Sequence, residues 1–202
     1  MDKQEIEVKF LIQDVKRIVS SLIQLGAELI SPRVHEMNLR FDTPEHSLTN
    51  EQRVLRLRKD TRSHLTYKGA ALTEQGVSKR QEIEFEVSDF SATQNMLEAL
   101  GYEVSVTYEK YRTTYCFHQL EIVLDEMPFG LFVEIEGPDA ESIKEASDSL
   151  GLNWSAGCTL SYMALFEHFK STRKMTMENL TFSAFDNIQV EAHDLGLKYA
   201  DQ

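Results

Sequence analysis

The chain has 202 residues and a formal net charge of −12, with 42% hydrophobic and 27% charged residues. That length accommodates one domain with a packed interior and leaves little room for a second core. The acidic balance argues against nucleic acid or an anionic membrane as the main partner, because both require a basic surface.

The chain also lacks features of secreted or membrane proteins. No apolar run approaches the roughly 20 residues of a membrane-spanning helix, and residues 1–9 are charged rather than forming a secretory apolar segment. Cys116 and Cys158 are the only cysteines, too few for a disulfide framework or a cysteine-rich zinc site. We therefore expect a cytoplasmic protein.

Three segments have the spacing of amphipathic helices, and each begins at an aspartate and ends at Leu-Gly: residues 14–26, 89–101 and 139–151. An aspartate side chain accepts hydrogen bonds from the free amides at a helix start, and glycine adopts the left-handed conformation that ends a helix. Apolar residues at helical spacing predict a fourth helix over residues 159–169.

Period-two alternation between the helices predicts strands. The candidates are residues 4–12, 34–42, 53–59, 63–68, 77–87, 103–117 (expected as two strands), 120–125 and 131–137. About eight strands with mostly short connections predict an antiparallel sheet that curls or closes. The fold class is therefore α+β, with too few helices to cover both faces of an open parallel sheet.

The sequence also contains an internal similarity. Residues 4–8 read QEIEV and residues 81–85 read QEIEF. Each copy is followed by a helix ending in Leu-Gly and then by a strand with a basic centre, at Arg40 in one half and at Lys110 and Arg112 in the other. Two similar halves predict one barrel with pseudo-twofold symmetry. Chance similarity between short alternating strands is the alternative interpretation.

Charged residues occupy one face of nearly every predicted strand, because side chains two positions apart share a face. Glu5, Glu7 and Lys9 lie together, opposite three apolar residues. The same spacing groups Arg56 with Arg58, Arg80 with Glu82, Glu84 and Glu86, Lys110 with Arg112, and Glu134 with Glu136. Asp125 lies opposite Ile122 and Leu124, and Lys68 ends its strand.

A solvated face of an ordinary sheet would show similar alternation. Two features favour another interpretation: like charges occur in pairs within a strand, and the pattern recurs in nearly every strand. If the sheet closes and helices cover its apolar outer face, the charged face lines a polar lumen. Such a lumen needs compensating ions. Inward carboxylates suit a hard divalent cation, and inward Arg and Lys suit a polyphosphate.

The order of motifs resembles the CYTH family of triphosphate tunnel metalloenzymes. The motifs are Glu5-Ile6-Glu7-Val8-Lys9, Asn38-Leu39-Arg40-Phe41-Asp42-Thr43-Pro44, Leu55-Arg56-Leu57-Arg58, Thr66-Tyr67-Lys68-Gly69, Arg80-Gln81-Glu82-Ile83-Glu84, Glu109-Lys110-Tyr111-Arg112, Leu124-Asp125 and Phe132-Val133-Glu134-Ile135-Glu136-Gly137. The resemblance covers residues 4 to 169 and implies a tunnel of eight antiparallel strands, a closed β-barrel with a polar lumen. It defines a tunnel domain over residues 1–169 and a C-terminal extension over residues 170–202.

The resemblance also implies roles for individual residues. Mg²⁺ or Mn²⁺ would be held by Glu5, Glu7, Glu84, Asp125, Glu134 and Glu136. Phosphate oxygens would be bound by Lys9, Arg40, Arg56, Arg58, Lys68, Arg80, Lys110 and Arg112. Lys68, Asp125 and Glu7 are the catalytic candidates. Arg40 stands where many relatives have an aromatic residue.

Three functions fit these motifs. The leading hypothesis is metal-dependent hydrolysis of inorganic, nucleoside or thiamine triphosphate. The second is a class IV adenylate cyclase, which makes cyclic AMP and pyrophosphate from ATP. The third is a non-catalytic polyphosphate-binding module, which would have no need of so many metal-type carboxylates. We expect a small-molecule triphosphate as the partner and a monomer or homodimer as the assembly.

The segment after residue 169 lies outside the resemblance. It begins with basic residues, contains the aromatic residues Phe182 and Phe185, and ends acidic. It could dock on the barrel or serve as a partner-binding extension, and we favour docking.

Overall fold

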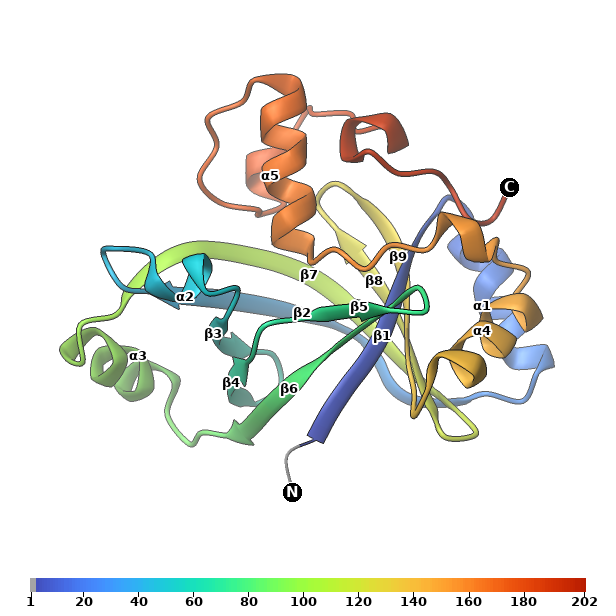
Figure 1. The fold of residues 1–202 in the computed structure, drawn as a ribbon, viewed down its shortest axis with the longest axis horizontal. Coiled ribbons are helices and arrows are strands. Elements are labelled where there is room, and N and C mark those ends of the chain that lie inside the picture. Colours follow the sequence, from blue (N-terminus) through green and yellow to red (C-terminus); the bar gives the residue numbers. More distant parts are fainter. Residues whose placement is uncertain (1–2) are drawn as a thin grey trace.

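The computed structural model describes residues 3–202, which form a ring of strands with helices around it (Figure 1). The strands are β1 (Lys3–Ile12), β2 (Glu28–Asp42), β3 (Val54–Lys59), β4 (Ser63–Lys68), β5 (Leu72–Glu74), β6 (Val77–Glu86), β7 (Glu103–Phe117), β8 (Leu120–Met127) and β9 (Gly130–Glu136). The helices are α1 (Val15–Gln24), α2 (Ser47–Asn50), α3 (Phe90–Ala99), α4 (Ala140–Ser149) and α5 (Tyr162–Arg173). Short 3₁₀ turns span Trp154–Ala156, Ser183–Phe185 and Ala192–Leu195.

The sheet closes on itself. Its strand order is β1-β9-β8-β7-β2-β3-β4-β6, with β5 beside β6, and β6 pairs again with β1. Every pairing is antiparallel, including the closing one between β1 and β6. The predicted antiparallel ring is therefore confirmed, with the short strand β5 as an addition.

The strand order agrees with two similar halves. β1 pairs with β6, and β2 pairs with β7, so the first two strands of each half lie side by side. β3 and β4 then follow β2 around the ring, just as β8 and β9 follow β7 in the other direction. Helices α1 and α3 occupy equivalent places between the first two strands of each half.

The predicted helix boundaries are largely confirmed. The side chains of Asp14, Asp89 and Asp139 accept hydrogen bonds from backbone amides in the first turns of α1, α3 and α4. After each of these helices comes a glycine with positive φ. The fourth prediction placed the helix start too early, because the backbone of Cys158 pairs with that of Lys9. This extended segment delays α5 until after Ser161, which caps it.

Two strand predictions were also wrong. β7 is one strand rather than two, and β2 begins at Glu28 rather than at residue 34. The two strands pair along their length, with register shifts on either side of Ser31 and between Arg40 and Phe41. Such irregularities let long strands bend and interrupt the alternation of side chains. Pro32, which has no amide hydrogen, lies within the first irregular stretch.

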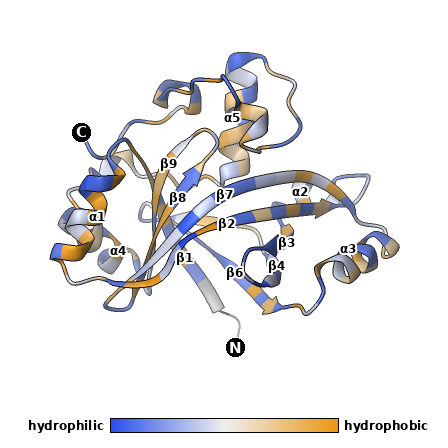
Figure 2. Ribbon diagram, turned by 180° about the vertical axis from the view of Figure 1, so that it is seen from behind, coloured by the Kyte–Doolittle hydropathy of each residue, from blue (hydrophilic) through white to orange (hydrophobic). Residues whose placement is uncertain are grey.

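Helices cover the apolar outer face of the ring. Ile18 of α1 and Ile143 of α4 belong to a buried cluster with the outward residues of β1, β8 and β9. Leu97 of α3 packs against residues of β2 and β3 on the other side. In Figure 2, α1 carries hydrophobic colour beside β8 and β9. With their apolar face covered in this way, the strands direct the opposite, charged face inward.

The C-terminal segment packs on the ring as well. Phe166 and Phe169 of α5 are buried, together with Leu180 and Phe185 from the segment after it. Their cluster includes Leu11, Phe132 and Tyr108, which share strand faces with Lys9, Glu134 and Lys110. Apolar side chains thus continue the inward face beyond its charged part. Leu180 also forms a parallel β-bridge with Tyr108.

Candidate functional site

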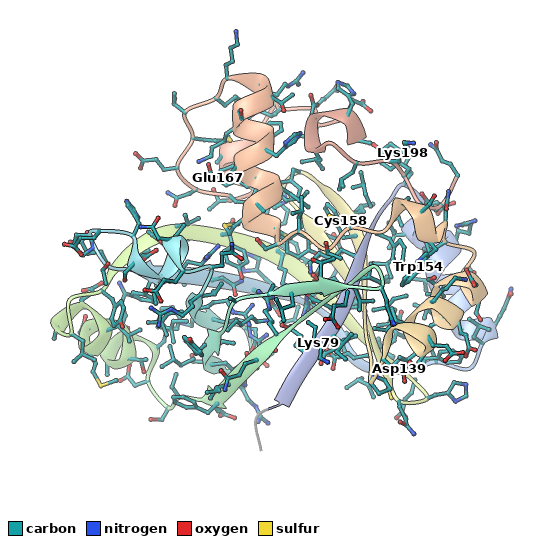
Figure 3. All side chains as sticks on the ribbon, viewed as in Figure 1. Lys79, Asp139, Trp154, Cys158, Glu167 and Lys198 are labelled. Atoms are coloured by element: carbon teal, nitrogen blue, oxygen red, sulfur yellow. The ribbon has the colours of Figure 1, made fainter. Side chains whose placement is uncertain are left out.

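The inner face of the ring lines a cavity of about 710 Å³. All the predicted phosphate-binding residues line it: Lys9, Arg40, Arg56, Arg58, Lys68, Arg80, Lys110 and Arg112. Of the predicted metal-binding carboxylates, Glu5, Glu7, Glu84, Glu134 and Glu136 line the same cavity. Figure 3 shows the side chains of the described residues on the ribbon, in the same view as Figure 1. The alternation in the sequence therefore brings together residues separated by up to 131 positions.

One side of the cavity is an acidic wall, which consists of Glu5 and Glu7 on β1 and Glu134 and Glu136 on β9. The two strands are neighbours, and Glu7 lies opposite Glu136 in their register. The Nζ atom of Lys9 lies 2.7 Å from a carboxylate oxygen of Glu7 and 3.1 Å from one of Glu134. This lysine therefore bridges the two strands of the acidic wall.

Glu5 is held by cations from other strands. Its carboxylate oxygens lie 2.5 Å from Lys68 Nζ and 2.8 Å from Arg80 Nε. Burial alone would raise the pKa of Glu5, but these two cations reverse the effect and lower that pKa to about 2. The cations Lys9 and Arg112 likewise outweigh burial at Glu134 and hold the pKa of its carboxyl well below the ordinary value. Both carboxylates are therefore ionised at neutral pH.

The opposite side is a basic wall, which consists of Arg40 on β2 and Arg56 and Arg58 on β3. Arg40 and Arg56 face each other in the register of the two strands. The guanidinium groups of Arg56 and Arg58 lie 3.2 and 3.3 Å from the carboxylate of Glu84 on β6. The Thr66 hydroxyl also donates to Glu84, at 2.6 Å. Glu84 thus joins two guanidinium groups from the next strand but one.

Asp125 occupies a different position from the other predicted carboxylates. It is only 1% exposed and is absent from the residues that line the cavity. Its carboxylate accepts hydrogen bonds from Lys110 Nζ at 3.0 Å, from Arg112 at 2.7 and 2.5 Å, and from the Tyr162 hydroxyl at 3.0 Å. Asp125 is therefore placed to hold Lys110 and Arg112, and its predicted metal and catalytic roles stay predictions.

The sequence analysis missed Glu36, which lines the cavity from β2 and is 2% exposed. It lies 3.5 Å from Lys110 Nζ and 3.9 Å from Arg58. Burial would raise the pKa of Glu36, but Lys110 and arginines including Arg112 and Arg58 lower it to about 2. Its position four residues before Arg40 on the same strand face was a signal that could have revealed it.

Tyr162 was also missed. It comes from the first turn of α5, lines the cavity, and donates its hydroxyl to Asp125. The Nζ atoms of Lys9 and Lys110 each lie 5.6 Å from the centre of its ring, which permits cation–π attraction. No strand alternation could have revealed a residue that enters the site from a helix.

The donors of the acidic wall have the right chemistry for Mg²⁺ or Mn²⁺, since both ions prefer carboxylate oxygens. Among the residues described, however, no three carboxylate, histidine or cysteine side chains are grouped as a metal site. Glu5, Glu7 and Glu134 instead contact lysine and arginine. The residues thus fit such an ion by donor type, and binding it would require some of these ion pairs to open.

The model of the CYTH domain matches residues 3–153 of the chain. The chain belongs to the CYTH domain family. This match includes every strand of the ring, while α5 and the segment after it lie outside it. The family resemblance that the strand motifs predicted is therefore confirmed.

Known relatives are consistent with this assignment. The CYTH chain is 28% identical to the adenylate cyclase CyaB of Aeromonas hydrophila over 173 residues. The aligned region covers 81% of this chain and 88% of the relative. A candidate adenylate cyclase of Vibrio parahaemolyticus has a similar structure, with a TM-score of 0.73 and 22% identity over 83% of this chain and 99% of that one.

A structurally similar protein from Hippeastrum is described as having a dominant triphosphatase activity, although it is named as an adenylyl cyclase candidate. Its TM-score is 0.62 at 19% identity, and the match covers 86% of this chain and 97% of that one. Adenylate cyclase and triphosphatase therefore both occur in the descriptions of similar proteins. No helix in the described part of this chain is long and apolar enough to cross a membrane.

Proposed function

We propose that this CYTH domain hydrolyses a triphosphate compound with the help of Mg²⁺ or Mn²⁺. The observation that carries the proposal is the composition of the cavity, where eight cationic side chains and the acidic wall line the same space of about 710 Å³. A polyanion and a divalent cation together match both kinds of charge, and neither would match alone. The triphosphatase activity described for the Hippeastrum protein supports this proposal.

The cationic side chains would bind and orient the phosphate oxygens. Arginine offers two parallel N–H donors to a phosphate, and lysine acts as a compact point charge. The cations come from β1, β2, β3, β4, β6 and β7, so they surround the chain of phosphates rather than contact it from one side. Phosphoryl transfer depends mainly on such positioning and charge neutralisation.

The acidic wall would hold the metal, with Glu5, Glu7, Glu134 and Glu136 as its ligands and Glu84 as a candidate for a second ion. When bound, such an ion neutralises phosphate charge and polarises the bond that breaks. Lys68, which lies beside Glu5 and 3.4 Å from Glu82, would stabilise the charge that develops on the leaving oxygen. Glu7 would orient the attacking water and accept its proton.

Cyclisation of ATP is the second candidate, and the similarity to adenylate cyclase CyaB favours it. In that reaction the ribose 3′-hydroxyl attacks the α-phosphorus, and pyrophosphate leaves. The same cationic side chains and the same acidic wall would serve both reactions. The reactions differ in which phosphorus is attacked and in which oxygen attacks it.

Product analysis distinguishes these functions. The purified protein would be incubated with Mg²⁺ or Mn²⁺ and with inorganic triphosphate, ATP or thiamine triphosphate in turn. Orthophosphate release supports the hydrolase, whereas cyclic AMP with pyrophosphate supports the cyclase. Tight triphosphate binding without any product would overturn both proposals and favour a non-catalytic binding module.

A further inference from the structure

The ion pairs inside the ring form one continuous ion-pair network, in which positive and negative side chains alternate. Each nitrogen-to-oxygen contact in it measures 3.9 Å or less, and its members come from every strand of the ring except β5. In order they are Glu82, Lys68, Glu5, Arg80, Glu7, Lys9, Glu134, Arg112, Asp125, Lys110, Glu36, Arg58, Glu84 and Arg56. Charged contacts therefore connect the acidic wall with the basic wall.

The ion-pair network crosses between the two sides of the ring at two junctions. One side consists of β1, β9, β8 and β7, and the other of β2, β3, β4 and β6. Where β1 pairs with β6, Glu5 contacts both Lys68 and Arg80 from the other side. Where β2 pairs with β7, Glu36 lies opposite Lys110 and contacts it. No other ion pair between described side chains that line the cavity crosses there, so Glu36 is the single link of the network at this junction.

Glu36 is held by charge rather than by short hydrogen bonds. Its carboxylate lies 3.5 Å from Lys110 Nζ and 3.9 Å from Arg58, and its Oε2 atom accepts no hydrogen bond from the described residues. Burial disfavours the ionised form, but cations including Lys110, Arg112 and Arg58 lower the pKa of Glu36 to about 2. A buried carboxylate of this kind depends on its cations, and the cations are attracted to it in return. The charge of Glu36 therefore ties the positions of Lys110 and Arg58 to each other.

Shared partners give the ion-pair network a way to pass a change from one wall to the other. With a divalent cation on the acidic wall, Arg112 would lose a carboxylate partner there. It would then rely more on Asp125, which it shares with Lys110. Lys110 in turn would rely more on Glu36, and Glu36 would release Arg58 to a phosphate oxygen. Each step exchanges one partner of a shared ion, so the series is broken if Glu36 carries no charge.

We propose that Glu36 is a positioning residue that couples the two walls, so that a divalent cation on the acidic wall increases the affinity of the basic wall for a polyanion. Glu36 acts through Lys110 and Arg58 and contacts neither ligand. This inference rests on the proposed function, because it concerns the two ligands of the same site. A carboxylate with a merely structural role would behave differently: its loss would weaken the binding of each ligand alone and leave their cooperation unchanged.

Calorimetric titration with diimidotriphosphate, whose nitrogen bridges resist hydrolysis, tests the inference without turnover. In wild-type protein, Mg²⁺ is expected to increase the affinity for this analogue about tenfold over the affinity in EDTA. Glu36→Gln should keep the affinity in EDTA within about threefold of wild type, while the Mg²⁺ effect falls below about threefold. Glu36→Asp keeps the charge on a shorter side chain and should give an intermediate Mg²⁺ effect. Glu126→Gln is the matched control, because Glu126 pairs with Arg33 outside the cavity.

Urea unfolding tests the same link with no ligand present. No ion pair of the described structure joins Glu134 directly to Arg58, and the ion-pair network connects them only through Glu36. Glu134→Gln and Arg58→Gln are therefore expected to be non-additive, by more than about threefold in the unfolding equilibrium constant. In a Glu36→Gln background the two changes should be additive to within about twofold, as independent sites are.

An equal Mg²⁺ effect in Glu36→Gln and wild type would overturn the inference, and so would a weaker affinity in EDTA with the Mg²⁺ effect intact. Additive unfolding effects with Glu36 present would also overturn it, and they would leave the proposed function in place because no ligand is involved. If wild-type protein bound no analogue and released no product from triphosphate with Mg²⁺, the proposed function and the inference would both fail. Should Glu36→Gln be unfolded, Glu36→Asp decides, and an undiminished Mg²⁺ effect in that variant would overturn the inference.

Discussion

The acidic and basic walls of the cavity face each other, and they differ in how their charges are balanced. On the acidic wall, Glu5, Glu7 and Glu134 each contact lysine or arginine from neighbouring strand positions. On the basic wall, Arg56 and Arg58 share Glu84, while Arg40 has no ion pair with a described residue. An anion can therefore bind Arg40 without breaking a contact, whereas a metal must displace cations from the carboxylates.

This difference indicates how the two ligands would help each other. A lysine displaced from the acidic wall by a divalent cation becomes available to a phosphate oxygen. Lys9 and Lys68 are the residues best placed for this exchange, since both lie between carboxylates and line the cavity. The ion pairs of the described structure would then be replaced by contacts with metal and phosphate.

The largest expected effect comes from breaking the acidic wall alone. Glu7→Gln should lower the rate of metal-dependent hydrolysis by roughly 100-fold or more, because it removes a charged ligand and the proposed acceptor of the water proton. Triphosphate binding in EDTA should be kept, since the basic wall is unchanged. Steady-state kinetics and calorimetry measure the two quantities, and an unchanged rate would rule out the proposed role of Glu7.

Acid should destabilise the ion pairs that line the cavity. Glu5 and Glu36 have folded-state pKa values of about 2, below the ordinary 4.5. Each ionised carboxylate therefore contributes on the order of 2 kcal/mol to the free energy of unfolding. This contribution is complete above about pH 4.5 and is lost as the pH falls towards 2. Urea unfolding at a series of pH values measures this loss. In Glu36→Gln, the free energy of unfolding should depend less steeply on pH between pH 4.5 and 2. The same pH dependence in the variant and the wild type would contradict the lowered pKa of Glu36.

Metal and polyanion should bind cooperatively if the ion pairs exchange as described. Mg²⁺ should increase the affinity for a non-hydrolysable triphosphate analogue by roughly tenfold, and the analogue should increase Mg²⁺ affinity by the same factor. Calorimetric titrations in both orders test this reciprocity. Glu134→Gln, which removes one partner of Lys9, should reduce the coupling. Independent binding of the two ligands would show that the walls are not linked.

The smallest expected effect concerns the residue from α5. Tyr162→Phe removes the hydroxyl that donates to Asp125 and should lower the free energy of unfolding by about 1–2 kcal/mol. Arg112 and Lys110 remain on that carboxylate, so the fold should be kept. Tyr199→Phe is a suitable control, because no hydrogen bond of its hydroxyl is found in the described structure. Equal stability of the two variants would indicate that the Tyr162 hydroxyl contributes little.

The inward face could be predicted because strand alternation is a local property. Glu5, Glu7 and Lys9 share a face whatever their partners are, and the aspartate caps are equally local. The pairing of Glu5 with Lys68 and Arg80 depends on how β1 meets β6, which no short segment encodes. Tyr162 lies on the buried face of α5 like an ordinary core residue, so only the folded chain reveals its hydrogen bond to Asp125.

The hydrogen bonds of β1 connect parts of the chain that are made at very different times. Its backbone pairs with β6, β9 and Cys158, and the carbonyl of Leu11 accepts a hydrogen bond from the amide of Ala200 at 2.8 Å. During synthesis, β1 emerges first and must wait for partners as many as 189 residues later. Contacts of such long sequence separation slow folding. The acidic wall itself joins β1 to β9, so a nascent chain can form it only after β9 has been made.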